Sequence, residues 1–164
     1  MLPKPTVYLD TSVINFLYAD DAPLMQASTV EFFDNFIKPG IYETFVSEFV
    51  VQEINNTIND YKRSQLLSVI EEYNLPFVEQ FDSLEIARLA NLYVQDKIIP
   101  ASKHTDALHI AATVVNKIDY LVSWNYRHLA NANRERKVLL VNLQNNYTHP
   151  LRIVTPLYLM DTNN

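Results

Sequence analysis

Val7-Tyr8-Leu9-Asp10-Thr11-Ser12 is the stretch of this chain that points most directly to its fold. Residues 7–9 are apolar or aromatic, as is typical of a short buried strand. Asp10 ends that run, and the mostly apolar residues 13–18 then predict a helix. An acid that follows a strand and faces a helix start lies where open α/β sheets place their ligand sites. Asp10 is therefore the first candidate for a functional residue.

The rest of the sequence alternates strand-like and helix-like segments. Strand-like runs cover residues 7–9, 41–46, 76–78, 120–123, 138–141 and 152–154. Helical patterns cover residues 23–37, 47–58, 61–73, 83–95 and 105–117, and Thr155-Pro156 opens a short helical turn. Such alternation predicts a parallel sheet covered by helices on both faces. We therefore expect an α/β fold in which residues 1–164 form a single domain.

The composition excludes several classes of protein. Apolar residues make up 48% of the 164 positions, enough for a sizeable core. The absence of cysteine excludes disulfides, thiolate metal sites and thiol nucleophiles. Gly40 is the only glycine, so the phosphate-binding loops and the nucleophile elbow that need several glycines are excluded too. Residues 1–5 lack the apolar core of a signal peptide, and no run is long enough to span a membrane, so we expect a cytoplasmic protein.

The charge of the chain is negative but unevenly distributed. A net charge of −6 argues against a protein that coats nucleic acid, and suits a site for divalent cations or a basic partner. Four basic residues nevertheless follow closely after Asn125: Arg127, Arg134, Arg136 and Lys137. They are either a solvated helix face or a surface that binds the RNA backbone, and the pattern leaves both interpretations open.

Two acids in the predicted helices are further candidates. Glu53 interrupts a mostly apolar stripe in the helix over residues 47–58, where a buried carboxylate needs a partner or a metal ion. The alternative is a position at the flank of the stripe, from which Glu53 reaches water. Asp106 follows a predicted N-cap at Thr105 and points away from the apolar stripe of its helix, although an acid in the first turn is also ordinary helix chemistry. His109 lies one turn further on and is either a ligand or, as is more usual, a packed and hydrogen-bonded neighbour.

Asn125 follows the strand-like run 120–123 as Asp10 follows the first strand. The two side chains should therefore reach the same edge of the sheet, whereas Asp119 precedes its strand and is interpreted as structural. Mg²⁺ and Mn²⁺ prefer oxygen ligands, and clustered carboxylates repel one another unless a cation is present. Acids collected from distant segments therefore predict a metal-dependent phosphodiesterase site.

Four segments in order resemble those of PIN domains, and within them the VapC-type toxins of prokaryotic toxin–antitoxin pairs. They are Val7-Tyr8-Leu9-Asp10-Thr11-Ser12, then Val46-Ser47 followed by Glu53-Ile54, then Thr105-Asp106-Ala107-Leu108-His109-Ile110-Ala111-Ala112, and Tyr120-Leu121-Val122-Ser123-Trp124-Asn125. The resemblance implies a three-layer α/β/α fold with a central parallel sheet. It also implies Mg²⁺- or Mn²⁺-dependent endoribonuclease activity, a homodimer, and a cognate antitoxin protein that holds the toxin inactive.

Carried over to this chain, the resemblance assigns the site residues. Asp10, Glu53 and Asp106 look like the three acidic metal-site residues, and Ser12 resembles the hydroxyl residue that orients the first acid or a water. Asn125 stands where many members have a fourth acid, and its neutral amide is a poorer metal ligand. Trp124 and His128 flank this turn and could contact RNA, although packing is the more usual role for such a tryptophan.

Two other classes of protein are alternatives. Haloacid-dehalogenase-type phosphotransferases also place an acid after the first strand. Their pattern has a second aspartate two positions further on, where this chain has Ser12. A PIN-like RNA- or protein-binding module with a catalytically weakened site is the other alternative, and Asn125 is the residue that suggests it.

Overall fold

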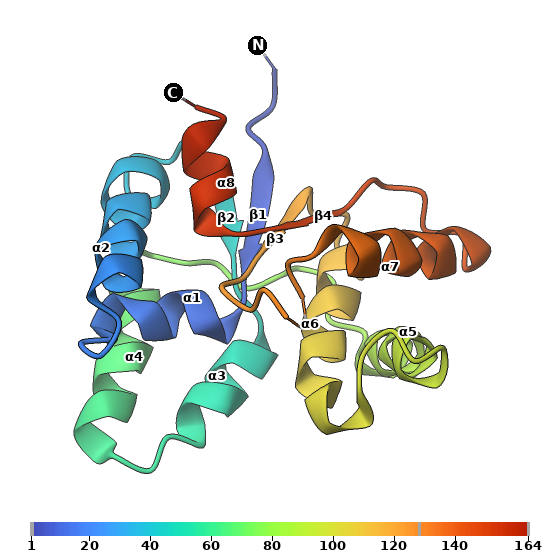
Figure 1. The fold of residues 1–164 in the computed structure, drawn as a ribbon, viewed down its shortest axis with the longest axis horizontal. Helices are drawn as coiled ribbons and strands as arrows, with labels where there is room; N and C mark the ends of the chain where they lie inside the picture. Colours follow the sequence, from blue (N-terminus) through green and yellow to red (C-terminus); the bar gives the residue numbers. More distant parts are fainter. Residues whose placement is uncertain (1, 128, 164) are drawn as a thin grey trace.

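The computed structural model describes residues 2–127 and 129–163, and it shows a parallel sheet between two layers of helices (Figure 1). The four strands of the sheet are β1 (Thr6–Leu9), β2 (Glu43–Phe45), β3 (Tyr120–Val122) and β4 (Arg152–Val154). Their order is β2-β1-β3-β4, and every neighbouring pair is parallel. The expected α/β/α fold with a central parallel sheet is thereby confirmed.

The helices divide into two groups on opposite sides of the sheet (Figure 1). One group consists of α1 (Thr11–Asn15), α2 (Pro23–Phe32), α3 (Glu48–Asn55), α4 (Asp60–Glu72) and α8 (Pro156–Asp161). The other consists of α5 (Ser83–Gln95), α6 (His104–Val115) and α7 (Ala132–Gln144). Short turns extend three of them: η1 (Phe16–Tyr18) follows α1, η2 (Phe33–Ile37) follows α2, and η3 (Ala101–Lys103) leads into α6.

The central strands are buried because both faces of the sheet are covered. Val7, Tyr8 and Leu9 are all fully buried, which explains why β1 reads as a continuous apolar run without polar alternation. In the register of the sheet, Leu9 pairs with Val122, so β1 and β3 end at the same level. The residues that follow these two strands therefore start from the same edge of the sheet.

Two predicted strands are wrong or incomplete. Residues 138–141 belong to α7, because Val138 and Val141 are buried on one helical face while Leu140 between them is exposed. Residues 76–78 contribute only a single bridge, between Phe77 and Val46. Pro76 has no N–H to donate to a longer ladder.

The predicted start of α6 also needs correction. The helix begins at His104, so Thr105 already lies inside it and is not the N-cap. The turn η3 runs directly into α6, so the helix starts one residue before the predicted range 105–117. Asp106 remains in the first turn, as the sequence predicted.

The buried apolar side chains of the described residues form a continuous core on both faces of the sheet. None of the helices in residues 2–127 and 129–163 has the length and apolar character needed to cross a membrane.

Candidate active site

The carboxyl-terminal edge of the sheet carries the first candidate residues. The backbone N–H of Asp10 donates to the carbonyl of Val122 over 3.2 Å, and that of Ser123 donates to Val154 over 2.9 Å. These bonds carry the β1–β3 and β3–β4 pairing one residue past the strands. The turns that follow β1 and β3 are thereby fixed side by side.

Asp10 serves as the N-cap of α1 and is only 4% exposed. Its Oδ1 accepts hydrogen bonds from the hydroxyl of Ser12 over 2.5 Å and from the backbone N–H of Val13 over 3.4 Å. The cap explains why a helix begins directly after Asp10. Ser12 thus contacts Asp10 through the oxygen that also caps the helix, consistent with its predicted orienting role.

A chain of hydrogen bonds links Asp10 to the other candidates after β3. The Ser12 hydroxyl accepts from the backbone N–H of Trp124 over 3.0 Å, and the Ser123 hydroxyl accepts from that of Asn125 over 3.0 Å. The Asn125 side-chain amide then donates to Oδ2 of Asp106 over 3.3 Å. Three candidates, Asp10, Asn125 and Asp106, are therefore tied to one another through the turn after β3.

Glu53 reaches this edge from α3, whose N-cap is Ser47. Its side chain is 35% exposed, so it is neither fully buried nor free in solvent. Oε1 of Glu53 accepts hydrogen bonds from the hydroxyl of Thr11 over 2.6 Å and from Nε2 of His109 over 2.5 Å. Helical spacing puts His109 within reach of Asp106, but its ring hydrogen-bonds to Glu53, which comes from a different helix.

The electrostatics of the three acids reflect their proximity. Burial raises the pKa of Asp10 above its ordinary value, against attraction from His109 and hydrogen bonds from Ser12 and Ser123.

Burial, and then the charge of Asp10, raise the pKa of Asp106 to about 6. Burial would also raise the pKa of Glu53, but hydrogen bonding and electrostatic attraction from His109, with a hydrogen bond from Thr11, lower it below its ordinary value.

The carboxylate oxygens of the candidate acids are of the kind that a hard divalent cation prefers. The charge of Asp10 disfavours the ionised form of Asp106, a situation that a bound cation relieves. In the described residues, no three His, Cys, Asp or Glu side chains are grouped so that together they could hold a metal ion. Mg²⁺ is commonly bound through one or two carboxylates with waters in its other positions, and Asp10 and Asp106 could supply those two.

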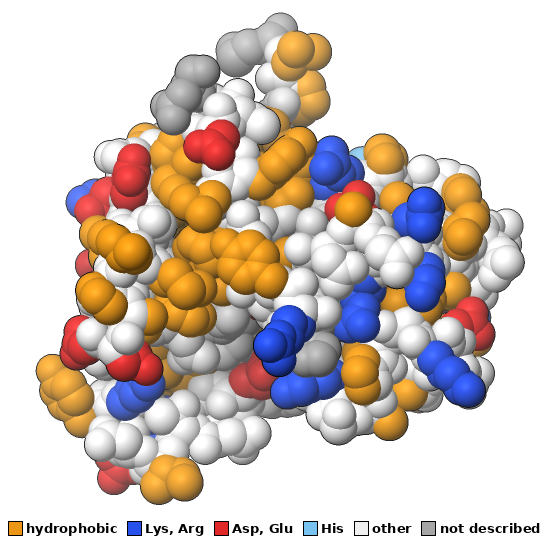
Figure 2. Space-filling view, in the orientation of Figure 1, with side chains coloured by type: hydrophobic (Ala, Val, Ile, Leu, Met, Phe, Trp, Pro, Cys, Tyr) orange, Lys and Arg blue, Asp and Glu red, His pale blue; other side chains and the backbone are white. Residues whose placement is uncertain are grey.

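The four predicted RNA-binding residues lie on α7 and on the loop before it. Figure 2 shows Lys and Arg side chains gathered over these segments. Arg127, Arg136 and Lys137 are exposed, whereas Arg134 is partly buried. Arg136 and Lys137 lie on the solvent side of α7, and Arg127 lies two residues after Asn125.

Trp124 packs into the core and is not a surface for RNA. It is 4% exposed, and its indole N–H donates to Thr29 over 2.9 Å. Tyr126, which is 49% exposed and contacts the Trp124 ring, is the accessible aromatic residue of this turn. His128, the other flanking residue that the sequence singled out, lies outside the described residues.

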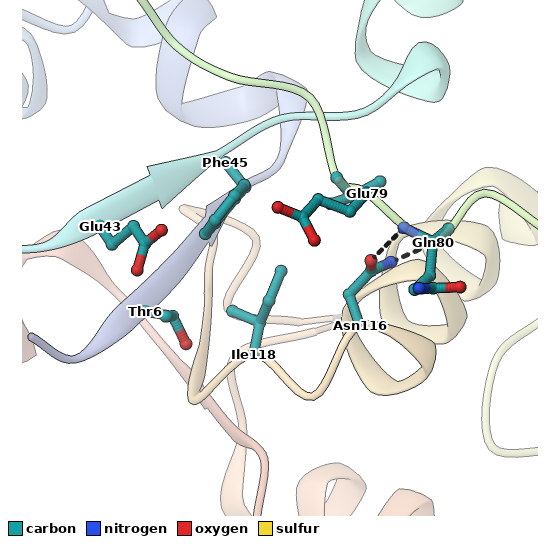
Figure 3. Close-up of a pocket in the computed structure, with 8 residues that line it drawn as sticks. Thr6, Glu43, Phe45, Glu79, Gln80, Asn116 and Ile118 are labelled. Carbon is teal, nitrogen blue, oxygen red and sulfur yellow. Dashed lines mark hydrogen bonds between the residues drawn. The ribbon is translucent and has the colours of Figure 1, made fainter. Parts of the chain in front are cut away.

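Figure 3 shows a pocket at the opposite edge of the sheet. Its lining includes Thr6 and Glu43, which pair at the amino-terminal ends of β1 and β2, and Asn116, which follows α6. Asp119, near the same edge, accepts hydrogen bonds from the backbone N–H and the hydroxyl of Thr6 and contacts His149. Its structural role stays a prediction. This pocket is separated from the acids by the length of the strands.

Thr11 and Ser123 also belong to the hydrogen-bonded cluster, and neither was predicted from the sequence. Both are buried hydroxyl residues directly after or beside a strand end, and both donate or accept hydrogen bonds with the candidates. Their position next to Asp10 and Asn125 was a visible signal. The hydrogen-bonding partner of each hydroxyl could not be predicted, because the partners come from distant segments.

No protein-family model matches the sequence, and no curated protein matches it either.

The neutral side chain of Asn125 allows a test of how far the ion site extends. We expect Asn125→Asp to tighten Mn²⁺ binding by roughly 10-fold, because it replaces a donor to Asp106 by a third acceptor charge. Isothermal titration calorimetry on the metal-free protein measures the change. Asn116→Asp adds the same charge at the far end of α6 and should leave the affinity as it is. Equal affinities for wild type and Asn125→Asp would put residue 125 out of reach of the ion.

Proposed function

We propose that this chain is a Mg²⁺- or Mn²⁺-dependent endoribonuclease of the PIN-domain kind. The observation that carries the proposal is the hydrogen-bonded path from Asp10 through Ser12, Ser123 and Asn125 to Asp106. It gathers two carboxylates with raised pKa values at the ligand-binding edge of a parallel sheet. Asp119, by contrast, binds Thr6 and His149 and no other acid in these hydrogen bonds.

Each residue of the site would have its own role in the proposed reaction. Asp10 and Asp106 would hold the cation, with Ser12 and Asn125 keeping their carboxylates in place. When bound, the cation would stabilise charge on the phosphodiester and make a water more acidic. Glu53 adds a third negative charge from α3, kept ionised by its hydrogen bonds from Thr11 and His109.

RNA is the proposed substrate because of what surrounds the acids. Arg127 offers exposed positive charge two residues after Asn125, and Arg136 and Lys137 add exposed positive charge on α7. Tyr126 adds an exposed ring on which an unpaired base could stack. A phosphate backbone would bind the basic residues while the scissile phosphate lies over the acids.

The test of this function is cleavage of single-stranded RNA by the purified protein. Cleavage should require Mg²⁺ or Mn²⁺, stop in excess chelator and return when the metal is restored. Cleavage that continues at full rate in chelator would overturn the metal-dependent mechanism. RNA binding without any cleavage would favour the alternative of a PIN-like binding module, which the amide at Asn125 supports.

If the basic residues of α7 bind RNA phosphates, the affinity for RNA should depend on salt concentration. Each phosphate contact to single-stranded nucleic acid contributes about 0.7 to the slope of log affinity against log salt concentration. Arg136→Ala with Lys137→Ala should therefore reduce that slope by about 1.4 and leave the cleavage rate at saturating RNA nearly unchanged. Fluorescence anisotropy over a salt series measures the slope.

The matched control for this double variant is Lys38→Ala with Lys62→Ala, two exposed lysines in the helical layer on the other side of the sheet. This pair should leave the slope as it is. If the α7 variant and the control behave alike, the basic residues of α7 are a solvated helix face.

We further propose that the nuclease acts as the toxin of a toxin–antitoxin pair, with an antitoxin and a second copy of the chain as partners. The support for this role is the resemblance of the four sequence segments to VapC-type toxins. Expression of the chain alone should slow growth, and coexpression of the neighbouring gene should relieve it. Slow growth that persists with Asp10→Asn would show that the harm does not come from nuclease chemistry.

A further inference from the structure

A chain of buried polar side chains ends at Glu53. The hydroxyl of Tyr8 lies 2.6 Å from that of Ser47 and 2.6 Å from Nδ1 of His109. Nε2 of His109 then lies 2.5 Å from Oε1 of Glu53. Tyr8 and Ser47 are fully buried and His109 is 1% exposed, so water does not compete for these bonds.

The direction of the hydrogen bonds follows from their end. A carboxylate only accepts, so the bond between His109 and Glu53 places a hydrogen on Nε2. In the tautomer with its hydrogen on Nε2, Nδ1 accepts from the Tyr8 hydroxyl, which in turn accepts from Ser47. Every group in the chain has a partner in this arrangement, as buried polar groups require.

The hydrogen-bonded side chains also connect three elements, and the path begins and ends on the same helix. Ser47 is the N-cap of α3, accepting from the backbone N–H of Phe49 over 3.2 Å, and Glu53 lies on that same helix. Tyr8 belongs to β1, next to Asp10, and His109 belongs to α6, one turn after Asp106. These hydrogen bonds therefore fix the start of α3 and the Glu53 carboxylate relative to β1 and α6, which carry the other acids.

The His109 ring has little freedom to turn away. It contacts the ring of Tyr8 with centroids 5.6 Å apart, and the ring of Phe49 in an edge-to-face arrangement at 6.4 Å. An apolar side chain would fill the same space without the cost of burying polar atoms. Packing alone therefore does not explain why the position is a histidine with both ring nitrogens engaged.

We propose that His109 is a positioning residue for the metal site, which Tyr8 and Ser47 hold in the tautomer that donates to Glu53. Both donors to Glu53, His109 and Thr11, use Oε1. Neither of these hydrogen bonds uses Oε2, which can therefore accept from a water of a cation that Asp10 and Asp106 would hold. This inference rests on the proposed function, because it takes the charge of Glu53 to assist metal binding by those two acids.

The test compares variants that remove or keep the donor to Glu53. His109→Leu removes it, Tyr8→Phe frees the ring to adopt the other tautomer, and His109→Gln offers an amide N–H in place of Nε2–H. Loss of a hydrogen-bonding partner around a metal site typically costs about 10- to 100-fold in affinity. We expect Mn²⁺ affinity, measured by calorimetry on the metal-free protein, to fall about 10-fold in His109→Leu and about 3-fold in Tyr8→Phe.

His109→Gln should recover most of the lost affinity. The Mn²⁺ concentration for half-maximal cleavage should rise by the same factors, while KM for RNA at saturating Mn²⁺ stays the same. Tyr93→Phe is the matched control: Tyr93 is also fully buried, but its hydroxyl binds Asn142 of α7 at a distance from the acids. Its Mn²⁺ affinity should equal that of wild type, which separates positioning from general loss of stability.

The outcomes distinguish this inference from the proposed function. If Glu53→Gln weakens Mn²⁺ binding but Tyr8→Phe and His109→Leu do not, His109 has no positioning role although the metal site stands. If Asp10→Asn and Glu53→Gln both bind Mn²⁺ like wild type, the proposed metal site itself is wrong. Should His109→Leu fail to fold, Tyr8→Phe against Tyr93→Phe carries the test, and equal affinities in that pair overturn the inference.

Discussion

Asp10→Asn and Asp106→Asn should each lower metal-dependent RNA cleavage by at least about 10²-fold, the scale on which loss of one main charge-stabilising group acts. The amide keeps the shape of the side chain, and an asparagine at position 10 can still cap α1 through its Oδ1. The fold should therefore survive while the negative charge that would hold the cation is lost. Initial rates on single-stranded RNA at saturating Mg²⁺, and again at saturating Mn²⁺, measure the effect.

Asp119→Asn is the matched control for these two variants. Asp119 is also an aspartate with several hydrogen bonds, but it anchors Thr6 and His149 beyond the other end of the strands. Its replacement should leave the cleavage rate within a few-fold of wild type, even if it costs some stability. Undiminished cleavage by both Asp10→Asn and Asp106→Asn would exclude this site, whatever activity the protein has.

Asp106→Asn should make the metal-free protein more stable at neutral pH. The native carboxyl has a pKa of about 6 against an ordinary value of 3.8, so the folded state binds the proton more tightly than the unfolded chain does. Between these two values the native state holds more protons, and the stability of wild type contributed by this group falls as pH rises. The variant, which cannot ionise, escapes that loss, so its advantage should be absent below pH 4 and complete above pH 6 or so.

The size of this effect is limited by the partial exposure of Asp106. A shift of about two pKa units corresponds to roughly 3 kcal/mol, which solvent screening reduces to about 1–2 kcal/mol. An acid in the first turn of α6 is also favoured by the helix dipole by about 0.3–1 kcal/mol, and the variant forgoes that. We expect a net gain of about 1 kcal/mol, or a rise in Tm of about 3 °C.

Mn²⁺ should reverse the order of stability. A ligand at about 100 times its Kd adds roughly 2.7 kcal/mol to the state that binds it, and wild type should gain far more than Asp106→Asn. Thermal unfolding of both proteins at pH 4, 5, 6 and 7, with and without Mn²⁺, tests the sign in each condition. A metal-free variant that is no more stable than wild type at pH 7 would contradict the assigned pKa, and a missing reversal would place the ion elsewhere.

Much of the fold could be predicted because its signals are local. The continuous apolar run of β1 and the helical stripes of α3, α5 and α6 depend on residues close together in the chain, and the structure confirms them. The run at residues 138–141 misled because its four residues suit either a buried strand or a helix. Only the burial of Val138 and Val141 with exposure of Leu140 reveals the helical period.

The sequence by itself determined which side chains could reach the carboxyl-terminal edge of the sheet, because the residue after a parallel strand must leave at that edge. Asp10 and Asn125 were placed in this way, and the β1–β3 register agrees with it. The tertiary structure alone decided which groups bind one another there. His109 joins Glu53 and not Asp106, because the packing of α3 against α6 brings residues 56 positions apart to hydrogen-bonding distance. Helical spacing describes neighbours within one helix and carries no information about contacts between two.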